Sequence, residues 1–294
     1  KEAGKRSQSL VGKLLLFGRK RAPEMSEVDL GLVVHEFCTM MNPIMEGIEC
    51  RYIGMPDYPV MIRGDEHQLN QALFNICMNG KEAMDPEGGV LLVHLQEILH
   101  DNRAYARLSI TDSGKGIAQQ DVEHIFEPFF TRKSAGPPTG LGPPWVYAIM
   151  EQHDGEIRLY SKVGYGPRVE LLLPLSGPAP QQEDPPAMAV LLAGRDEVLL
   201  DLCRRSLEDA GFQVHCARSQ KELAEQLEQR DHQFSCVLAE ADLYESSSWT
   251  DQASLIVYGE QKTSSAGCCL KTPFTMEQLI DTVNLAVSKD RSAT

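Results

Sequence analysis

The chain has 294 residues, of which 42% are hydrophobic and 24% are charged. This length indicates two domains of ordinary size, and the composition is typical of a soluble globular protein rather than a disordered, fibrous or membrane-embedded one. The net charge of −14 argues against a nucleic-acid-binding surface, which needs a local excess of Lys and Arg. It does not argue against a nucleotide, because backbone N–H groups, one Lys and a metal ion can hold a nucleotide.

The cysteines and the apolar segments indicate where the chain resides. Eight Cys occur without CxxC pairs or His partners at zinc spacing, which favours a reduced intracellular compartment. No stretch reaches the ~18 to 20 apolar residues that span a bilayer, and residues 1–10 lack the form of a signal peptide. We therefore expect a cytoplasmic chain, whose parent protein could be anchored in a membrane.

Hydrophobic periodicity predicts the elements of a first domain over residues 26–174. They are helices at Val28–Met45 and His67–Met84, and strands at Gly89–Gln96, Arg103–Thr111, Glu156–Ser161 and Arg168–Pro174. Residues 1–25 are interpreted separately, as the end of a dimerisation helix, because Leu10–Phe17 has a pattern compatible with the end of a helix. Helices with mostly antiparallel strands predict an α+β two-layer sandwich. The proline-rich segment 175–186 then loses all hydrophobic periodicity and is interpreted as a linker.

A second domain is predicted over residues 187–294, where strands alternate with helices. The strands are Ala187–Ala193, Gln213–Cys216, Phe234–Ala239, Ser254–Tyr258 and Cys268–Leu270, and the helices are Asp196–Ala210, Ser219–Gln229 and Thr275–Ser288. Alternation of this kind predicts an α/β doubly wound parallel sheet.

Two amides lie on the helix predicted over His67–Met84. Asn75 and Asn79 are four residues apart, so they share one helix face and can point at one ligand. Their neutral oxygens suit Mg²⁺, which takes its remaining ligands from water and phosphates. Taken alone, the pattern is more typical of two amides on a solvated or capping face.

The strand predicted over Arg103–Thr111 runs into Asp112, Gly114 and Gly116. A carboxylate at the end of a strand can accept a hydrogen bond from an adenine amino group, and glycines permit a close approach of backbone to a ligand. The alternative is a simple strand-to-turn junction, because Asp, Ser and Gly are common turn residues.

A Phe-rich segment at 125–133 is followed by Gly140 and Gly142 just before a helix predicted from Trp145 to Gln152. The small residues and prolines between them indicate a lid over a pocket. Backbone N–H groups at the helix N-terminus, assisted by Lys133, could hold phosphates, although a flexible surface loop fits the same pattern.

The order of these motifs closely resembles the catalytic domain of sensor histidine kinases. That family shares the Bergerat ATP-binding fold with gyrase, a heat-shock chaperone and MutL, and it carries an N box, two glycine boxes and an F box. The resemblance covers about residues 26–174, and the closing hairpin at 155–174 favours the kinase branch. It implies binding of ATP and Mg²⁺, with Asn75 and Asn79 at the metal and phosphates and Asp112 at the adenine. The remaining nucleotide-binding residues that it implies are Lys81, Gly114, Gly116, Ile117, Phe130, Thr131, Lys133, Thr139, Gly140, Leu141 and Gly142.

The chain departs from the family pattern at two places and offers no clear phosphoacceptor. Pro143-Pro144 follows the second glycine box, and Gly80 stands where the family usually has Ala. Proline fits the first turn of a helix without losing a hydrogen bond. No matching His precedes residue 26, and His35 lies in the domain's own first helix, so no catalytic His is assigned.

The alternating pattern of the second domain ends in Cys269-Leu-Lys271-Thr-Pro273-Phe274. With this ending, the domain resembles a response-regulator receiver, but one that has lost its phosphorylation site. Its first strand runs into Ala193-Gly194-Arg195 where a receiver has an acidic pair, and its third strand runs into Glu240 where a receiver has the phosphoacceptor Asp. Its fourth strand runs into Tyr258-Gly259 where a receiver has a Thr or Ser. The resemblance retains Lys271, which could pair with Glu240. We interpret this domain as a regulatory pseudo-receiver, with phosphorylation at Asp242 as a minor alternative.

The sequence therefore predicts the ATP-binding portion of a hybrid sensor histidine kinase. It would transfer the γ-phosphoryl group to a His on a dimerisation domain that this chain lacks, within a homodimeric parent protein that also contacts a response regulator or phosphotransfer protein. One alternative is a scaffold that binds nucleotide and acts through protein contacts. Another is a chaperone-type ATPase clamp, for which the helix offers only Glu82, beyond Asn79, as a water-activating carboxylate.

Overall fold

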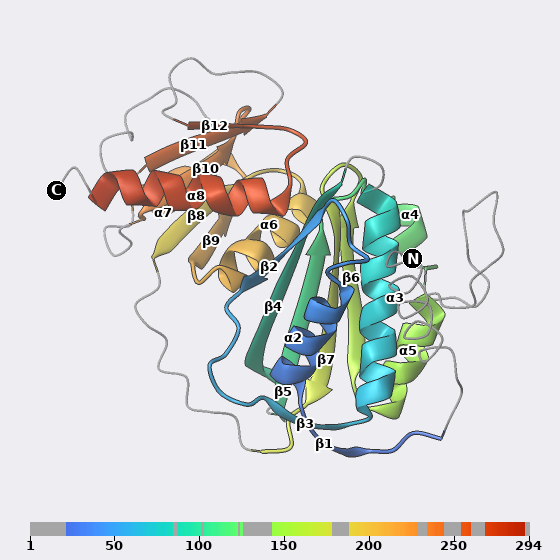
Figure 1. Cartoon of the computed structure of the whole chain (residues 1–294). Coiled ribbons are helices and arrows are strands. Elements are labelled where there is room, and N and C mark those ends of the chain that lie inside the picture. The colour runs from blue at the N-terminus through green and yellow to red at the C-terminus, as the bar shows by residue number, and fades with distance from the viewer. Residues whose placement is uncertain are drawn as a thin grey trace.

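The computed structural model describes residues 22–84, 88–100, 103–122, 124–125, 143–177, 188–228, 234–243, 254–259 and 268–291. Two five-stranded sheets organise this part of the chain, one in each half (Figure 1). The helix end predicted at 10–17 and most of the predicted linker lie outside the described residues, so the domain limits stay predictions.

The first sheet has the strand order β2-β4-β5-β7-β6. Its strands are β2 (Ile48–Ile53), β4 (Gly89–His100), β5 (Arg103–Asp112), β6 (Glu156–Lys162) and β7 (Gly166–Pro174). Strand β2 pairs with β4 in parallel, and the other neighbouring strands are antiparallel. A small second sheet pairs β1 (Ser26–Asp29) with β3 (Met61–Gly64).

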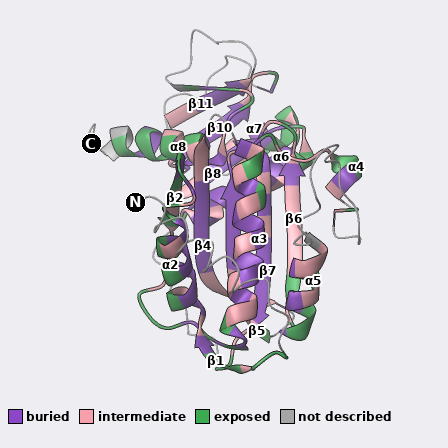
Figure 2. Cartoon of the chain, turned by 45° about the vertical axis from the view of Figure 1, so that its right-hand side comes forward, coloured by how far each residue is buried: buried purple, intermediate pink, exposed green. Residues whose placement is uncertain are grey.

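Helices cover one face of the first sheet (Figure 1). They are α2 (Leu30–Met41), α3 (Glu66–Met84) and α5 (Pro143–Gln152), and the short α4 (Gln119–Val122) follows β5. The apolar sides of the helices and of the strands form one core that includes Val34, Phe37, Leu73, Leu95 and Leu108. Figure 2 shows β4, β5 and β7 buried over much of their length. The predicted α+β two-layer sandwich is confirmed.

The start of this domain differs from the prediction. Val28 lies in β1 rather than in a helix, and Asp29 caps α2, because its carboxylate accepts hydrogen bonds from the N–H groups of Gly31 at 3.0 Å and Leu32 at 3.5 Å. The helix ends at Met41 instead of continuing to residue 45. Strands β1, β2 and β3 were not predicted; β1 and β3 have only four residues each, too few to show a hydrophobic period.

The second sheet has the order β12-β11-β10-β8-β9, and all its strands are parallel. The strands are β8 (Ala189–Ala193), β9 (Gln213–Ala217), β10 (Cys236–Glu240), β11 (Ser254–Gly259) and β12 (Cys268–Lys271), and the helices are α6 (Glu197–Asp209), α7 (Gln220–Glu228) and α8 (Met276–Arg291). This arrangement confirms the predicted doubly wound, receiver-like domain.

The two domains are packed together through α6 and α8. Leu92 of β4 and Tyr165 of the β6–β7 turn belong to the same buried apolar cluster as residues of the receiver-like domain, such as Leu199 and Phe274. At the end of α6, Asp209 is buried against charged side chains of the first sheet. The sheet face that the helices α2, α3 and α5 leave open is therefore partly covered by the receiver-like domain (Figure 1).

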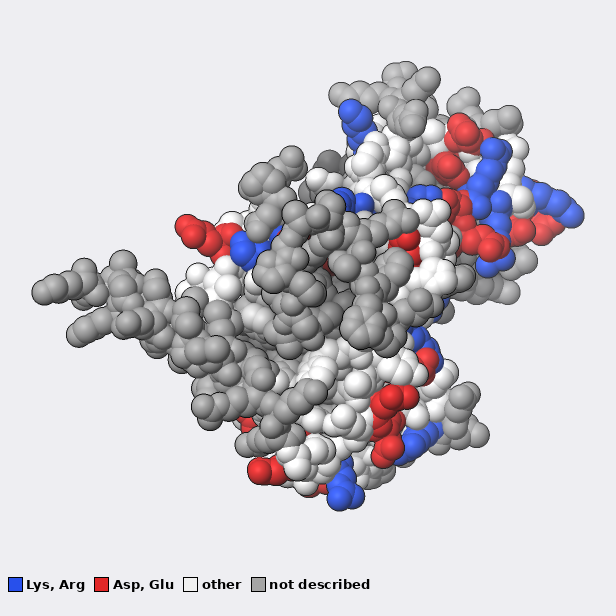
Figure 3. All heavy atoms as spheres, turned by 90° about the vertical axis from the view of Figure 1, so that its right-hand side faces the viewer, with Lys and Arg blue, Asp and Glu red and all other residues white. Residues whose placement is uncertain are grey.

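No described helix is both long and apolar enough to cross a bilayer. On the face shown in Figure 3, acidic and basic side chains are interspersed rather than gathered by sign.

Candidate functional site

Asp112 ends β5 at the edge of the first core and is only 8% exposed. Its Oδ1 accepts a hydrogen bond from the backbone N–H of Gly114 at 2.8 Å. Burial raises the pKa of Asp112 to about 7, although the Gly114 hydrogen bond acts in the opposite direction. Among the described residues, the N–H of Gly114 is the one hydrogen-bond donor to this carboxylate, and Oδ2 accepts from none of them.

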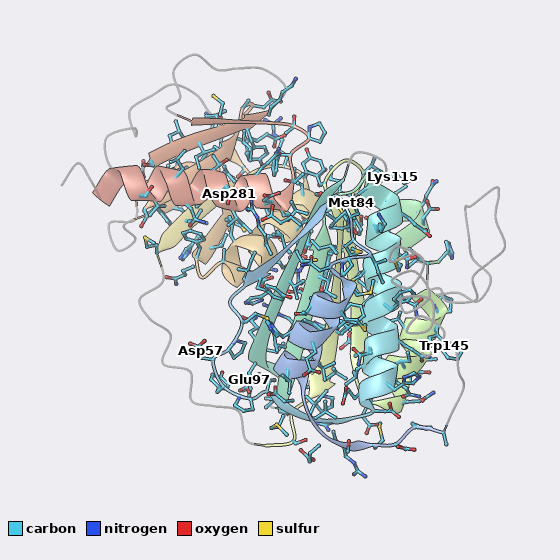
Figure 4. The ribbon with its side chains drawn as sticks, in the orientation of Figure 1. Asp57, Met84, Glu97, Lys115, Trp145 and Asp281 are labelled. Carbon is cyan, nitrogen blue, oxygen red and sulfur yellow. The ribbon has the colours of Figure 1, made fainter. Side chains whose placement is uncertain are left out.

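Helix α3 lies directly beside Asp112. A methyl group built on Gly80 would lie 3.2 Å from Asp112 Oδ2, and one built on Gly114 would lie 2.8 Å from the Cβ of Ala83. The helix predicted to carry the Asn pair therefore faces the predicted adenine end. Met84 and Lys115 mark this end of the domain in Figure 4, opposite Asp57 and Glu97.

Asn75 and Asn79 have different environments along α3. Asn75 is 3% exposed, and its amide nitrogen donates to the carbonyl of Gln71 at 3.1 Å. This hydrogen bond leaves its amide oxygen as the atom available to a ligand. Asn79, one turn later, is exposed. Lys81 lies half-buried near the end of the same helix.

Gly80 allows a small and specific test of this packing. Gly80→Ala should raise the free energy of unfolding by about 0.5 kcal/mol, because the gain of about 1 kcal/mol in helix propensity exceeds the cost of slight crowding. The new methyl group would contact Asp112 and Leu91 at 3.2 to 3.3 Å, and both are side chains that can shift by a few tenths of an ångström. Urea unfolding measures the change, and a loss above 1 kcal/mol would show that Asp112 cannot move.

The glycines after Asp112 are required by the protein's own packing. Gly116 has φ +71°, and a side chain there would lie 2.1 Å from the carbonyl oxygen of Lys162. Ile117 donates its backbone N–H to Ser161 Oγ at 2.9 Å. In the structure Gly114 lies against Ala83 of α3, and Gly116 allows the loop 112–117 to lie against the β6–β7 hairpin. Their predicted place beside a ligand stays a prediction.

The sequence analysis predicted the β6–β7 hairpin but did not assign any of its residues to the site. Gly166 has φ +77°, and a methyl group there would lie 1.9 Å from the carbonyl oxygen of Asp112. Ser161 is 2% exposed and lies behind the same loop. The pattern Lys-Val-Gly-Tyr-Gly was a usable signal for a tight turn, but it gave no indication that the turn supports Asp112.

Seven of the predicted nucleotide-binding residues lie outside the described residues: Phe130, Thr131, Lys133, Thr139, Gly140, Leu141 and Gly142. The helix that follows them begins at Pro143 rather than at Trp145, so both prolines occupy its first turn, as the sequence indicated. Trp145 Nε1 donates to Gln71 Oε1 at 3.4 Å, which joins α5 to α3.

The predicted phosphoacceptor end of the receiver-like domain is closed by a tyrosine. Tyr258 is 4% exposed, and its hydroxyl donates to the carbonyl of Ala193 at 2.9 Å. A methyl group on Gly194 would lie 2.1 Å from that hydroxyl oxygen, so an acidic residue there would collide with Tyr258. Tyr258, which stands where a receiver has a Thr or Ser, therefore excludes an acidic side chain at position 194.

Glu240 is held by a partner other than the expected lysine. Its Oε2 accepts the backbone N–H of Arg195 at 2.9 Å, and Lys271 is exposed. Within the part of the chain that the structure describes, no ion pair joins Glu240 to Lys271. The suggested Glu240–Lys271 pair is therefore wrong, because the carboxylate turns toward the β8–α6 loop.

Comparison with known proteins agrees with this geometry. The family described as "Histidine kinase-, DNA gyrase B-, and HSP90-like ATPase" matches residues 64–177. Sporulation kinase C of Bacillus subtilis (strain 168) is 33% identical over 173 residues, which are 58% of this chain and 39% of that protein. Sensor kinase CckA of Brucella abortus (strain 2308) is 30% identical over 269 residues, 82% of this chain and 28% of that protein.

A crystal structure of full-length ShkA in complex with AMPPNP is 22% identical and has a TM-score of 0.46, covering 97% of this chain and 63% of that one. The chain spans well under half the length of the two curated relatives. Its first domain is a histidine kinase catalytic domain, which belongs to the histidine kinase-, gyrase B- and HSP90-like ATPase family. A receiver-like domain follows it.

Proposed function

We propose that this chain is the ATP-binding catalytic part of a hybrid sensor histidine kinase, which transfers the γ-phosphoryl group of ATP to a histidine on a dimerisation domain. The observation that carries the proposal is Asp112, which is buried at the end of β5, faces α3 and leaves one carboxylate oxygen for an adenine amino group. A buried acceptor beside a helix with two amides suits the two ends of a nucleotide.

Mg²⁺ fits the donor set on α3. The amide oxygens of Asn75 and Asn79 are neutral hard ligands, and Mg²⁺ prefers oxygen ligands, combining a few from the protein with substrate phosphates and water. When bound, the ion would neutralise charge on the β- and γ-phosphates. Asn75 is fixed by its hydrogen bond to Gln71, which would orient its oxygen before the nucleotide arrives.

The receiver-like domain acts, in this proposal, as a regulatory module rather than as a phosphoacceptor. Support comes from Tyr258, which fills the space beside Gly194, and from Glu240, whose carboxylate accepts the backbone N–H of Arg195 in the β8–α6 loop. The partners proposed are the dimerisation domain of the parent kinase and a response regulator or phosphotransfer protein.

A calorimetric titration with ATP, with and without Mg²⁺, tests the proposal. Saturable binding that weakens when EDTA removes the metal is expected. Addition of a histidine-bearing dimerisation domain and γ-labelled ATP should then produce a labelled, acid-labile phosphohistidine on that domain. Binding without transfer would instead indicate a scaffold that acts through contacts, and absence of binding would refute both functions.

A further inference from the structure

One turn touches both the nucleotide side of the first domain and the receiver-like domain. This β6–β7 turn comprises residues 162–166, between β6 and β7. On its inner side, Gly164 donates its backbone N–H to the carbonyl of Lys115 at 2.8 Å. Gly116 lies against the carbonyl of Lys162, and Gly166 lies against that of Asp112. The turn is therefore a direct support for the backbone of the 112–117 loop.

The opposite side of the turn is held by the receiver-like domain. The ring of Tyr165 packs edge to face against Phe274, with centroids 5.2 Å apart and an interplanar angle of 87°. The ammonium group of Lys162 pairs with Asp196, the residue that caps α6. A methyl group on Gly164 would lie 3.1 Å from the Cβ of Pro273, so the ring of Pro273 packs closely against the turn there.

The residues of the receiver-like domain that contact the turn lie at the same end of that domain as Tyr258, which closes the degenerate phosphoacceptor site. Phe274 follows β12 and packs against Tyr258 at 5.9 Å, and Tyr258 is the residue that reaches Ala193. A continuous series of contacts thus runs from the closed phosphoacceptor end, through Phe274 and Tyr165, to the loop that contains Asp112. Rigid packing of this kind can transmit a change in one site to the other when both bias the position of one element.

We propose that the β6–β7 turn couples nucleotide binding to docking of the receiver-like domain, so that the docked domain raises the affinity for ATP. This coupling rests on the proposed ATP site at Asp112. The docked domain restricts the turn, the turn restricts the 112–117 loop, and ATP then binds a loop that is already ordered. By linkage, bound ATP strengthens docking by the same factor.

The test measures ATP affinity and amide hydrogen exchange in the whole chain. Phe274→Ala removes the ring that holds Tyr165 and should raise the Kd for ATP roughly fivefold, within the usual range of coupling between sites. It should also speed hydrogen exchange at Gly164 and Ile117, whose amides are hydrogen-bonded across the turn and the loop. Asp196→Asn keeps a good helix cap but loses the Lys162 pair, and it should raise the Kd about twofold.

Matched controls separate coupling from general damage. Phe234→Ala also removes a buried Phe from the receiver-like domain, but from a separate apolar cluster with Leu191 and Leu223 of that domain, and it should leave the Kd unchanged. Asp281→Asn removes an exposed interdomain pair with Arg51, away from the turn. Arg51 keeps its pair with Glu277, so docking and the Kd should stay unchanged.

The outcomes distinguish the two proposals. A Kd unchanged by Phe274→Ala, while exchange at Gly164 is faster, would overturn the coupling and leave the ATP site intact. An equal loss of affinity in Phe234→Ala would also overturn it, because damage to the receiver-like domain alone would then explain the effect. Failure of the unsubstituted chain to bind ATP would refute the proposed function, and the coupling with it.

Discussion

Asp112→Asn should weaken ATP binding roughly 100-fold, the loss expected for one hydrogen bond to a charged group. Asp112 Oδ1 already accepts the N–H of Gly114, so in the variant the amide nitrogen must take the place of Oδ2. That nitrogen would face the adenine amino group donor to donor. If the amide were flipped instead, it would face the Gly114 N–H in the same unfavourable way. Calorimetric titration measures the change.

The same substitution should stabilise the protein without nucleotide. Burial raises the pKa of Asp112 to about 7 from 3.8, so the folded state resists ionisation that the unfolded chain undergoes freely. The cost is absent below about pH 4, grows as the pH rises, and is complete above about pH 7. At pH 8 we expect Asp112→Asn to be more stable by roughly 2 to 4 kcal/mol, since each pKa unit corresponds to about 1.4 kcal/mol.

Urea unfolding at pH 4 and pH 8 checks this sign, because the gain should appear only at the higher pH. Asp57→Asn, an exposed carboxylate at the opposite end of the domain, serves as the control and should change neither stability nor ATP affinity (Figure 4). An ATP Kd for Asp112→Asn within threefold of the unsubstituted value would mean that Asp112 does not contact the base.

The elements around Asp112 were predictable because their signals are local. The helix with Asn75 and Asn79 has a long hydrophobic period, and the strand before Asp112 ends in glycines that mark its boundary. The second domain was predicted for the same reason: strands and helices alternate over a long segment. Short polar strands such as β1 carry too little pattern, and Asp29 could be identified as a cap only once the chain entering α2 was seen.

The contact between the two domains could not be predicted from the sequence. His94, Arg107, Arg168 and Glu170 lie on strands whose other face is apolar, and such alternation normally indicates a solvent-exposed face. In the structure Arg168 and Glu170 are 1% and 0% exposed. Only a docked partner explains charged side chains buried on the outer face of a sheet, and the sequence gives no sign of which surface meets it.

Asp209, near the C-terminal end of α6, is the centre of that contact. Its Oδ2 accepts a hydrogen bond from Arg168 Nη1 at 2.6 Å and from Ser109 Oγ at 3.1 Å, and its Oδ1 lies 3.1 Å from Arg107 Nη2. Burial alone would raise the pKa of Asp209, but the charges and hydrogen bonds of Arg168 and His94 together outweigh it and hold the pKa well below its usual range. His94 Nδ1 lies 3.0 Å from Asp209 Oδ1.

Asp209→Asn should destabilise the protein by about 3 to 5 kcal/mol, the usual effect of removing one partner of a buried ion pair. The variant leaves the guanidinium of Arg168 buried with only Glu170 to balance it, while Arg107 loses its nearest anion. Glu208→Gln is the matched control on the same helix: its pair with Arg204 is about one third exposed, so a change below about 1 kcal/mol is expected. Urea unfolding of both variants measures the difference. Equally small losses of unfolding free energy in both variants would mean that water replaces the Asp209 carboxylate at the interface. A large loss confined to Asp209→Asn identifies this carboxylate as the group that holds the receiver-like domain on the ATPase sheet.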